Sequence, residues 1–406
     1  MKNNPNEQIC AVTPDVTWVG VQDRELKVFD IVMETRYGST YNAYCIHAEK
    51  KTLIETVKGT FWNEYQNKLQ QVCDLSEIEY IVLNHTEPDH SGALPFLLKK
   101  APQATVVGSG QALSYLSEMM DTPFKSLKVQ DGDTLDLGNK TLRFIAAPNL
   151  HWPDTMFTWL EEDKVLFTCD AFGAHFCFDN PLDEEAEDYD EAFMYYFDVI
   201  LKPFSKFMLR AIEKIKDLPI EAICNGHGPI LRKRWKERVE QSHRMAKEYL
   251  TLTEAQHIRE VLVLYVSAYG YTRQQALAIE QGLTRHPNLK CTLLDVEHIL
   301  SGDLESALTR TDGILIGSPT INQNTLLPIY KVFAHINPVR DRLKPAGSFG
   351  SFGWSGEASQ IIHANLKALK LKTLDPLAAK FVPNGKKLEE FIDYGYRFGQ
   401  MLQHNH

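Results

Sequence analysis

Residues 81–92 read IVLNHTEPDHSG, an apolar run that ends in two histidines and two carboxylates within six positions and then meets a glycine. The pattern predicts a strand that passes into a helix. Because successive side chains of a strand point to opposite faces, His85, Glu87 and Asp89 are expected to converge on one side. The convergence of three ligand-type residues predicts a metal site.

His90 completes the pattern H-x-E-x-D-H. Ser91 or Asp89 is expected to cap a helix that begins at Gly92. The alternative interpretation is a helix cap with surface histidines. Four ligand-type residues within six positions favour the metal site over that alternative.

Three later segments end apolar runs with the same residue types: 147-APNLHWPDT-155, 167-FTCDAFG-173 and 223-ICNGHGPI-230. A lone histidine is usually a core residue, but the glycines on both sides of His227 allow a close backbone approach that a packed core does not require. Asp170 is a natural bridge between two metal ions, because a carboxylate has two oxygens. The candidate ligands are His85, Glu87, Asp89, His90, His151, Asp170 and His227.

Composition limits the possible partners. With 406 residues, 44% of them hydrophobic, the chain is long enough for two domains of ordinary size. A net charge of -10 gives no footprint for nucleic acid or an anionic membrane surface. The N-terminus lacks an export segment and no membrane helix is predicted, so a cytoplasmic protein is expected. Seven cysteines without a C-x-x-C pair are expected to be reduced, structural thiols.

The hydrophobic pattern divides the chain into two domains, expected at 1–252 and 257–406. The first is predicted to be a strand-rich α/β layer fold, with strands at 28–33 and 41–48 and helices at 61–73, 111–120 and 193–216. A helix at 232–250 and a polar joint follow. The second is predicted to be a doubly wound domain with parallel strands at 260–266, 290–296, 313–317 and 347–350. The acidic run 183–191 is interpreted as a solvated loop, with a docking patch for a basic partner as the alternative.

Three loops of the second domain suit a phosphorylated aromatic ligand. In 267-SAYGYT-272, two hydroxyls, a flexible glycine and the amides of a helix N-terminus suit a terminal phosphate. A nucleoside triphosphate is disfavoured, because the loop lacks the lysine of a P-loop. Two further loops follow later strands, where open doubly wound sheets bind ligands. The candidate residues are Ser267, Ala268, Tyr269, Gly270, Tyr271, Thr272, Ser318, Pro319, Thr320, Ile321, Asn322, Ser351, Phe352, Gly353, Trp354, Ser355, Gly356 and Glu357.

These two sets of motifs resemble known families. The metal motif and the later His, Asp and His resemble the metallo-β-lactamase superfamily. Its zinc hydrolases favour histidine where this chain has Glu87, and a hard carboxylate there favours iron or manganese. The region from about 257 to 400 closely resembles flavodoxin, which implies FMN.

Together the two halves resemble the flavodiiron proteins, or A-type flavoproteins, over almost the whole chain. The resemblance implies an α/β fold with an N-terminal metallo-β-lactamase-like αβ/βα sandwich and a C-terminal flavodoxin-like doubly wound parallel sheet. It also implies two non-haem irons. One is held by His85, Glu87, His151 and Asp170, and the other by Asp89, His90, His227 and the shared Asp170. The second histidine of the motif does not bind in every member of the family, which leaves the role of His90 open.

The same resemblance implies the reduction of O2 to water, of NO to N2O, or both, in a head-to-tail homodimer or a tetramer. No appended donor domain is expected, so the electrons are expected to come from a separate rubredoxin, or otherwise from F420H2 or an NADH-linked reductase. Trp152 and Tyr195 are candidate pocket residues. A zinc-dependent hydrolase with a flavodoxin-like regulatory domain, and a non-catalytic O2 or NO sensor, are the competing functions.

Overall fold

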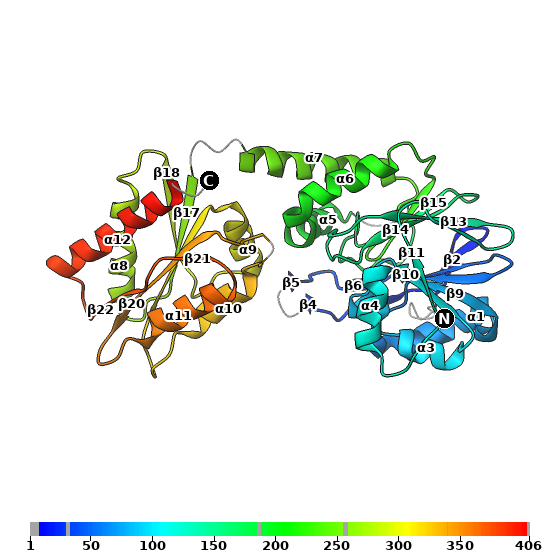
Figure 1. Ribbon diagram of the computed structural model, residues 1–406, viewed down its shortest axis with the longest axis horizontal. Helices are drawn as coiled ribbons and strands as arrows, with labels where there is room; N and C mark the ends of the chain where they lie inside the picture. The colour runs from blue at the N-terminus through cyan, green and yellow to red at the C-terminus, as the bar shows by residue number, and fades with distance from the viewer. Residues whose placement is uncertain (1–7, 30–32, 185–187, 255–258, 339, 404–406) are drawn as a thin grey trace. The chain divides into compact units, whose positions relative to one another are not determined.

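The computed structural model describes residues 8–29, 33–184, 188–254, 259–338 and 340–403 (Figure 1). It divides into one compact unit of residues 1–29 and 35–252 and another of residues 30–34 and 253–406. The expected start of the second domain, residue 257, lies outside the described residues. Residues 185–187 of the acidic run also lie outside the described residues. The same is true of residues 30–32 in the strand predicted at 28–33. The rest of that predicted strand contains β4 (Val28–Phe29) and the first residue of β5 (Met33–Glu34).

Two sheets form the centre of the first unit. One has the order β1 (Cys10–Thr13), β2 (Val16–Trp18), β7 (Tyr44–Ile46), β8 (Lys51–Ile54), β9 (Ile78–Val82), β10 (Thr105–Ser109), β11 (Ser126–Val129). The other has the order β12 (Thr134–Asp136), β13 (Thr141–Ala146), β14 (Met156–Leu160), β15 (Val165–Cys169), β16 (Ala222–Asn225). β3 (Val21–Asp23) pairs separately with β6 (Ser39–Tyr41).

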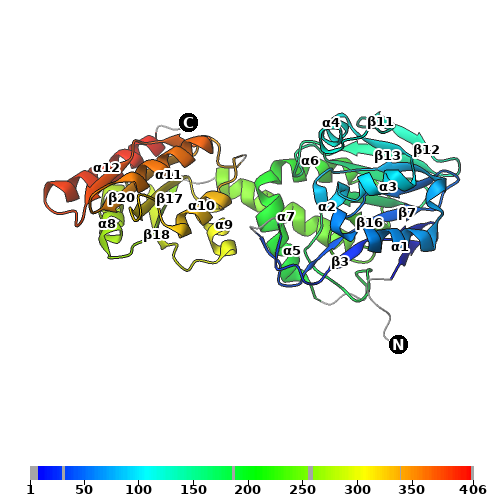
Figure 2. The same cartoon turned by 90° about the horizontal axis from the view of Figure 1, so that it is seen from below.

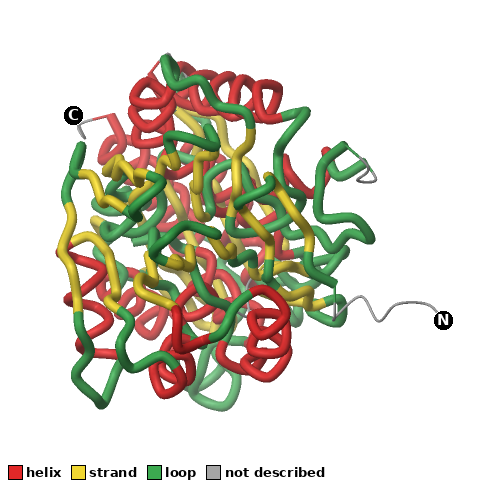
Figure 3. The backbone as a smooth tube through the Cα atoms, turned by 90° about the vertical axis from the view of Figure 1, so that its right-hand side faces the viewer, coloured by secondary structure: helices red, strands yellow, loops and turns green. Residues whose placement is uncertain are grey.

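Helices cover both sides of these strands. Figure 1 shows α1 (Trp62–Val72), α3 (Leu94–Lys100) and α4 (Gly110–Met119) on one side of the unit, and α6 (Ser205–Ile215) and α7 (Trp235–Glu254) on the other. Figure 3 shows the same layering from another direction, with strands between helices. Every residue of β14, β15 and β16 is buried, as expected for strands covered on both faces. The layers are those of an αβ/βα sandwich, as the sequence predicted.

The second unit is a parallel sheet of order β18 (Leu289–Asp295), β17 (Arg259–Tyr265), β19 (Gly313–Pro319), β20 (Pro345–Phe352), β21 (Lys372–Thr373), with β22 (Leu377–Lys380) also paired to β20. Helices α9 (Ser301–Arg310), α10 (Leu327–His335) and α11 (Glu357–Ala368) pack on one face, and α8 (Tyr271–Leu283) and α12 (Lys386–Gln403) on the other. Alternate residues of β17 therefore enter opposite cores: Leu262 and Leu264 one, Val261 and Val263 the other. This is the doubly wound fold that the sequence predicted.

Glycine allows α8 and α12 to approach closely, and the two helices lie side by side in Figures 1 and 2. A Cβ added at Gly282 would lie 1.9 Å from the backbone oxygen of Ile392, and one at Gly395 would lie 2.1 Å from that of Ile279. Backbone atoms cannot move aside as a flexible side chain can. Each glycine is therefore required by the helix that packs against it.

The helix predicted at 193–216 is present as a continuous helical segment, in which a π-helical and then a 3-10 turn separate α5 (Asp190–Tyr196) from α6 near Pro203, which has no N–H to donate. Two other local predictions were wrong. The strand predicted at 41–48 is divided between β6 and β7, because the side chain of Asn42 between them donates to the backbone of Asn225 and Gly228.

The predicted helix cap is also wrong. A short helix, α2 (Pro88–Ser91), already contains Asp89 and Ser91, and α3 has no side-chain cap. The hydroxyl of Ser91 donates instead to the backbone oxygen of Thr86 at 2.8 Å.

In the part of the chain that the structure describes, no helix is long and apolar enough to cross a membrane.

We expect Gly282→Ala to lower the free energy of unfolding of the second unit by about 2 kcal/mol, the usual cost of overpacking. Urea denaturation followed by circular dichroism measures the change. Gly110→Ala is the control, because its Cβ would meet only the flexible end of Lys128. An unchanged unfolding midpoint in Gly282→Ala would contradict this account of the helix contact.

Candidate metal centre and flavin pocket

The seven candidate ligands lie on segments that follow strands of the first unit, five of them on loops or turns and two on a short helix. His85 and Glu87 follow β9, His151 follows β13, Asp170 follows β15 and His227 follows β16. Asp89 and His90 lie on α2, where Pro88 occupies the first turn and needs no hydrogen-bond partner for its nitrogen.

The expected alternation along a strand end is therefore wrong for Asp89. Residues 88–91 are helical, so Asp89 leaves the backbone in a direction different from that of Glu87. The two carboxylates enter two neighbouring clusters rather than one.

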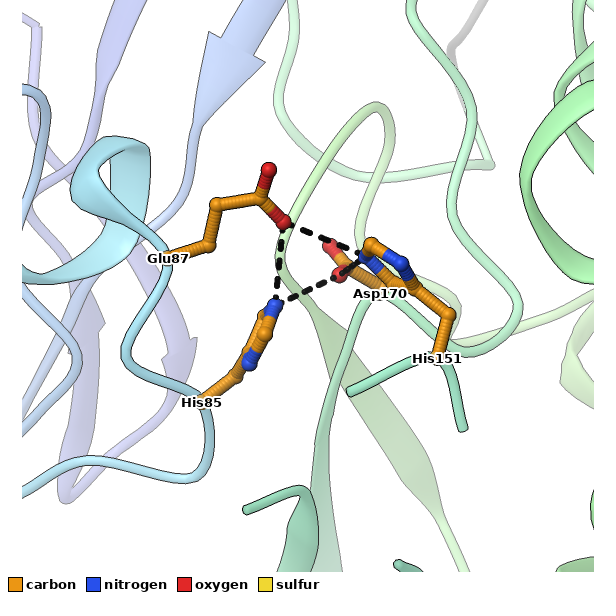
Figure 4. Close-up of side chains that lie close together, drawn as sticks. All are labelled: His85, Glu87, His151 and Asp170. Atoms are coloured by element: carbon orange, nitrogen blue, oxygen red, sulfur yellow. Dashed lines mark hydrogen bonds and ion pairs between the residues drawn. The ribbon is translucent and has the colours of Figure 1, made fainter. Parts of the chain in front are cut away.

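The first cluster joins His85, Glu87, His151 and Asp170 (Figure 4). The Nε2 atoms of His85 and His151 lie 3.1 and 3.2 Å from Oε2 of Glu87. The same two nitrogens lie 3.5 and 3.0 Å from Oδ2 of Asp170. Two imidazoles and two carboxylates thus point at one small volume.

The second cluster joins Asp89, His90 and His227. Nε2 of His90 and Nε2 of His227 lie 3.4 and 3.2 Å from Oδ2 of Asp89. They lie 3.1 and 3.3 Å from Oδ1 of Asp170. Asp170 therefore presents Oδ2 to the first cluster and Oδ1 to the second.

These residues fit a pair of metal ions. Glu87, Asp89 and Asp170 are three carboxylates whose side chains are 13%, 6% and 3% exposed. Neither oxygen of Asp89 accepts a hydrogen bond from any described residue. Buried anions of this kind require compensating positive charge, and bound cations would provide it. Carboxylate oxygen and imidazole nitrogen are donors that iron and manganese accept.

Two backbone features allow the candidate ligands to come close together. Cys169, immediately before Asp170, has a φ of 48°, a left-handed conformation that costs free energy for a residue with a side chain. A Cβ at Gly226 would lie 2.7 Å from Cε1 of His90. The glycine beside His227 therefore gives the close approach that the sequence indicated.

Other residues fix the orientation of two candidate ligand histidines. Nδ1 of His85 lies 3.2 Å from the carboxylate of Asp154, which accepts hydrogen bonds from the backbone N–H and the hydroxyl of Thr86 at 2.7 Å each. Nδ1 of His227 donates to the backbone oxygen of Thr40 at 2.5 Å. Each acceptor holds the proton on Nδ1 and leaves the lone pair of Nε2 free for a metal.

Sequence reasoning missed these orienting residues. Asp154 stands three positions after His151 in the quoted segment, so its carboxylate was a signal that could have been used. Thr40 acts through its backbone, which no sequence pattern reveals.

Aromatic rings surround the histidines. The ring centroid of Trp152 lies 5.1 Å from that of His85, as suits a pocket residue. Tyr196, the residue after the candidate Tyr195, makes ring contacts with His175 and His227, at 4.9 and 6.0 Å. His175 was not expected here, and its Nδ1 lies 2.7 Å from the hydroxyl of Ser39.

The flavin loops surround a cavity of about 290 Å³ in the second unit. It is lined by Ser267, Ala268, Tyr269, Tyr271, Thr272, Pro319, Thr320, Ile321, Asn322, Ser351, Phe352, Gly353, Trp354 and Phe381. Phe381 was not predicted, because it follows β22 far along the chain. Of the predicted residues, Gly270, Ser318, Ser355, Gly356 and Glu357 do not line the cavity.

The cavity lies where the strand order reverses. β18 and β19 pair on opposite sides of β17, and the loops after β17 and β19 both line the cavity. Open α/β sheets bind ligands at such a switch point. Gly270 has a φ of 81° and precedes α8, whose N-terminal amides suit a phosphate. Tyr269 and Trp354 are 80% and 83% exposed at the cavity, where a flat ring system could cover them. The residues therefore fit FMN.

Comparisons with known proteins agree with this geometry. The model of the family described as "ODP family beta lactamase" matches residues 40–228. The chain is 38% identical over 392 residues to the flavo-diiron protein of Clostridium acetobutylicum, over 95% of this chain and 97% of that protein. It is 33% identical over 401 residues to the anaerobic nitric oxide reductase flavorubredoxin of Vibrio vulnificus, over 96% of this chain and 79% of that protein.

A solved structure also matches over both units. The rubredoxin oxygen:oxidoreductase of Desulfovibrio gigas is similar with a TM-score of 0.72 and 27% sequence identity. The match covers 98% of this chain and 99% of that chain.

Metal binding is expected to release protons. Burial lowers the pKa of His151 and His227. The carboxylates that face them, Asp170 with Glu87 for His151 and Asp170 with Asp89 for His227, outweigh burial and raise these pKa values to about 9 and about 10. Burial lowers the pKa of His85 and His90 too, but neighbouring carboxylates outweigh burial and raise it. Bound metal must therefore displace more than the two protons of His151 and His227.

Adding Zn²⁺ to metal-free protein in weakly buffered solution with a pH indicator measures this release. The apparent metal affinity should rise as the pH increases toward 9. His151→Ala should release about one proton fewer, whereas His298→Ala, a change at an exposed histidine, should match the wild type. Equal release from His151→Ala and the wild type would refute the assignment.

Trp354→Ala is expected to weaken FMN binding about tenfold, since an aromatic stacking contact contributes about 1.5 kcal/mol. Fluorescence titration of the flavin-free protein with FMN measures the affinity. Leu277→Ala removes an exposed apolar side chain on α8 outside the cavity lining and is the control. Equal affinities of Trp354→Ala and Leu277→Ala would place the flavin ring elsewhere.

Proposed function

Because the chain belongs to the flavodiiron protein family of oxidoreductases, we propose that it reduces O2 to water, NO to N2O, or both. The relatives are named for each gas: the Desulfovibrio gigas protein for oxygen and the Vibrio vulnificus protein for nitric oxide. In this proposal the ligand residues of the first unit would hold two irons and the loops of the second unit would hold FMN.

The observation that carries the proposal is the division of the Asp170 carboxylate between two clusters. Its Oδ2 lies 3.0 Å from Nε2 of His151, and its Oδ1 lies 3.1 Å from Nε2 of His90. A single metal ion would leave one of these sets of ligand atoms unused. Zinc hydrolases favour histidine at the position of Glu87. A carboxylate is a harder ligand than an imidazole, so Glu87 makes the first cluster more favourable for iron.

We assign His85, Glu87, His151 and Asp170 to one iron, and Asp89, His90, His227 and the shared Asp170 to the other. When bound, a ferrous pair and reduced FMN together supply the four electrons that convert O2 to two waters, or the two that a pair of NO molecules needs. The protein holds the ligand atoms at a fixed spacing. Asp154 and Thr40 keep the protons of His85 and His227 on Nδ1, away from the metal side.

Aromatic side chains restrict water around these ligands. Trp152 packs on His85, Phe204 on His151, and Phe29 on His227. Apolar rings lower the local dielectric constant, which strengthens the attraction between the carboxylates and a cation.

We propose that electrons pass between the subunits of a head-to-tail homodimer, in which the FMN of one subunit faces the irons of its partner, or of a tetramer built from such dimers. A separate rubredoxin is the proposed electron donor, as in the name of the Desulfovibrio gigas relative, ahead of F420H2 or an NADH-linked reductase. Seven free cysteines suit a reducing compartment, and we propose the cytoplasm.

Metal and flavin analysis followed by anaerobic stopped-flow tests the function. We expect about two irons and about one FMN per chain. The reduced protein should be reoxidised by O2 or by NO much faster than free FMN, and Asp170→Asn should lose most of that rate because it removes the bridge. Bound zinc, with reoxidation no faster than free flavin, would contradict the proposal and leave a hydrolase.

A further inference from the structure

A third buried cluster shares His90 with the second. It consists of Glu55, His90 and Cys169, and one ligand-type atom of each lies within 4.8 Å of those of the other two. Glu55 follows β8, is 2% exposed, and has a φ of 61°. A buried carboxylate held on a left-handed backbone is costly on both counts. Its position therefore calls for a functional explanation.

Glu55 and its neighbour Thr56 hold His90 and the loop before it. The N–H and the hydroxyl of Thr56 both donate to the backbone oxygen of His90, at 2.9 and 2.6 Å. Oε1 of Glu55 accepts the N–H of Asn84 at 2.8 Å. Its other oxygen, Oε2, has no hydrogen-bond partner among the described residues, and neither has Nδ1 of His90.

The orientation of the imidazole decides which nitrogen faces Glu55. Nε2 of His90 lies 3.1 Å from Asp170 and 3.4 Å from Asp89. Nδ1 is therefore the nitrogen left for the carboxylate of Glu55. In His85 and His227 the corresponding nitrogen has an oxygen partner, Asp154 and the backbone of Thr40 respectively. Glu55 is the carboxylate available to give His90 a partner of the same kind.

We propose that Glu55 is a positioning residue: in the metal-loaded protein its Oε2 accepts the Nδ1 proton of His90, which leaves Nε2 free to bind the second iron. The proposal rests on the proposed function and deepens it, because it assigns His90 as a ligand in this chain. A carboxylate behind a ligand histidine fixes the tautomer and the ring orientation and raises the basicity of the nitrogen that binds the metal.

Glu55→Gln is a sharp test because it reverses the tautomer without changing the shape. The amide oxygen of glutamine is needed to accept the N–H of Asn84, so its NH2 group must face His90. A donor there makes Nδ1 an acceptor and places the proton on Nε2, where it blocks the metal. Glu64→Gln is the matched control: Glu64 is another carboxylate with a mostly buried side chain, and it lies on α1 beside Lys68.

The experiment uses the full-length protein loaded with iron and FMN and measures the loss of Fe²⁺ to a chromogenic chelator. In Glu55→Gln, one of the two irons should be lost at a chelator concentration about ten- to a hundredfold lower than in the wild type, the usual effect of removing such a partner. Glu64→Gln should match the wild type. Equal retention of both irons by Glu55→Gln and the wild type would overturn the proposal.

A double mutant shows whether Glu55 acts through His90. Glu55→Gln/His90→Ala should retain iron as His90→Ala does, because the carboxylate has no further effect once the ring is absent. Additive losses would overturn the proposal. A third bound metal ion that Cys169→Ser removes would also overturn it, since it would make the buried cluster a metal site of its own.

Measurements on the wild-type protein separate the role of Glu55 from the proposed function. If Glu55→Gln does not fold, histidine ¹⁵N NMR of the wild-type protein loaded with diamagnetic Zn²⁺ should still show His90 with its proton on Nδ1. A proton on Nε2 of His90 would refute the proposal. Wild-type protein that binds two irons and reacts with a gas, while Glu55→Gln is unaffected, would refute the role of Glu55 alone. Wild-type protein that binds no iron would refute the proposed function itself.

Discussion

The structure of the first unit depends on keeping three carboxylates buried together. Glu87, Asp89 and Asp170 are almost fully removed from water, and no described residue donates a hydrogen bond to either oxygen of Asp89. Such an arrangement requires opposite charge at the centre of the pocket. Loops from both sheets must therefore meet there, and the left-handed backbone at Cys169 and the bare backbone at Gly226 allow that convergence.

The architecture of the second unit depends on a different feature, a sheet whose loops surround a cavity that fits a flat ligand. Its parallel sheet buries both faces, so only the loops at the carboxyl ends of the strands remain for binding. The close contact of α8 and α12 through Gly282 and Gly395 fixes the helix that begins after the loop following β17. Rigid packing below the cavity thus supports loops that expose Tyr269 and Trp354.

Sequence reasoning found what local chemistry reveals. The ligand-type residues at strand ends, the doubly wound strands and the three loops were all visible in hydrophobic pattern and residue type. It failed where a tertiary contact decides: the helical turn of α2 separates Asp89 from Glu87, and Phe381 reaches the flavin cavity from a distant strand. Tyr195 and Tyr196 have the same residue type, so only the helix orientation shows that Tyr196 contacts His227. Glu55 ended an apolar strand, as the ligands do, but in no recognised motif.

The central claim is that Asp170 joins two irons into one centre. Low-temperature EPR and Mössbauer spectroscopy of partially reduced protein loaded with ⁵⁷Fe tests it most directly. The account predicts the signal of an exchange-coupled, mixed-valence iron pair, because one bridging carboxylate connects both ions. Spectra of isolated high-spin ferric ions alone, with no coupled signal at any degree of reduction, would contradict it.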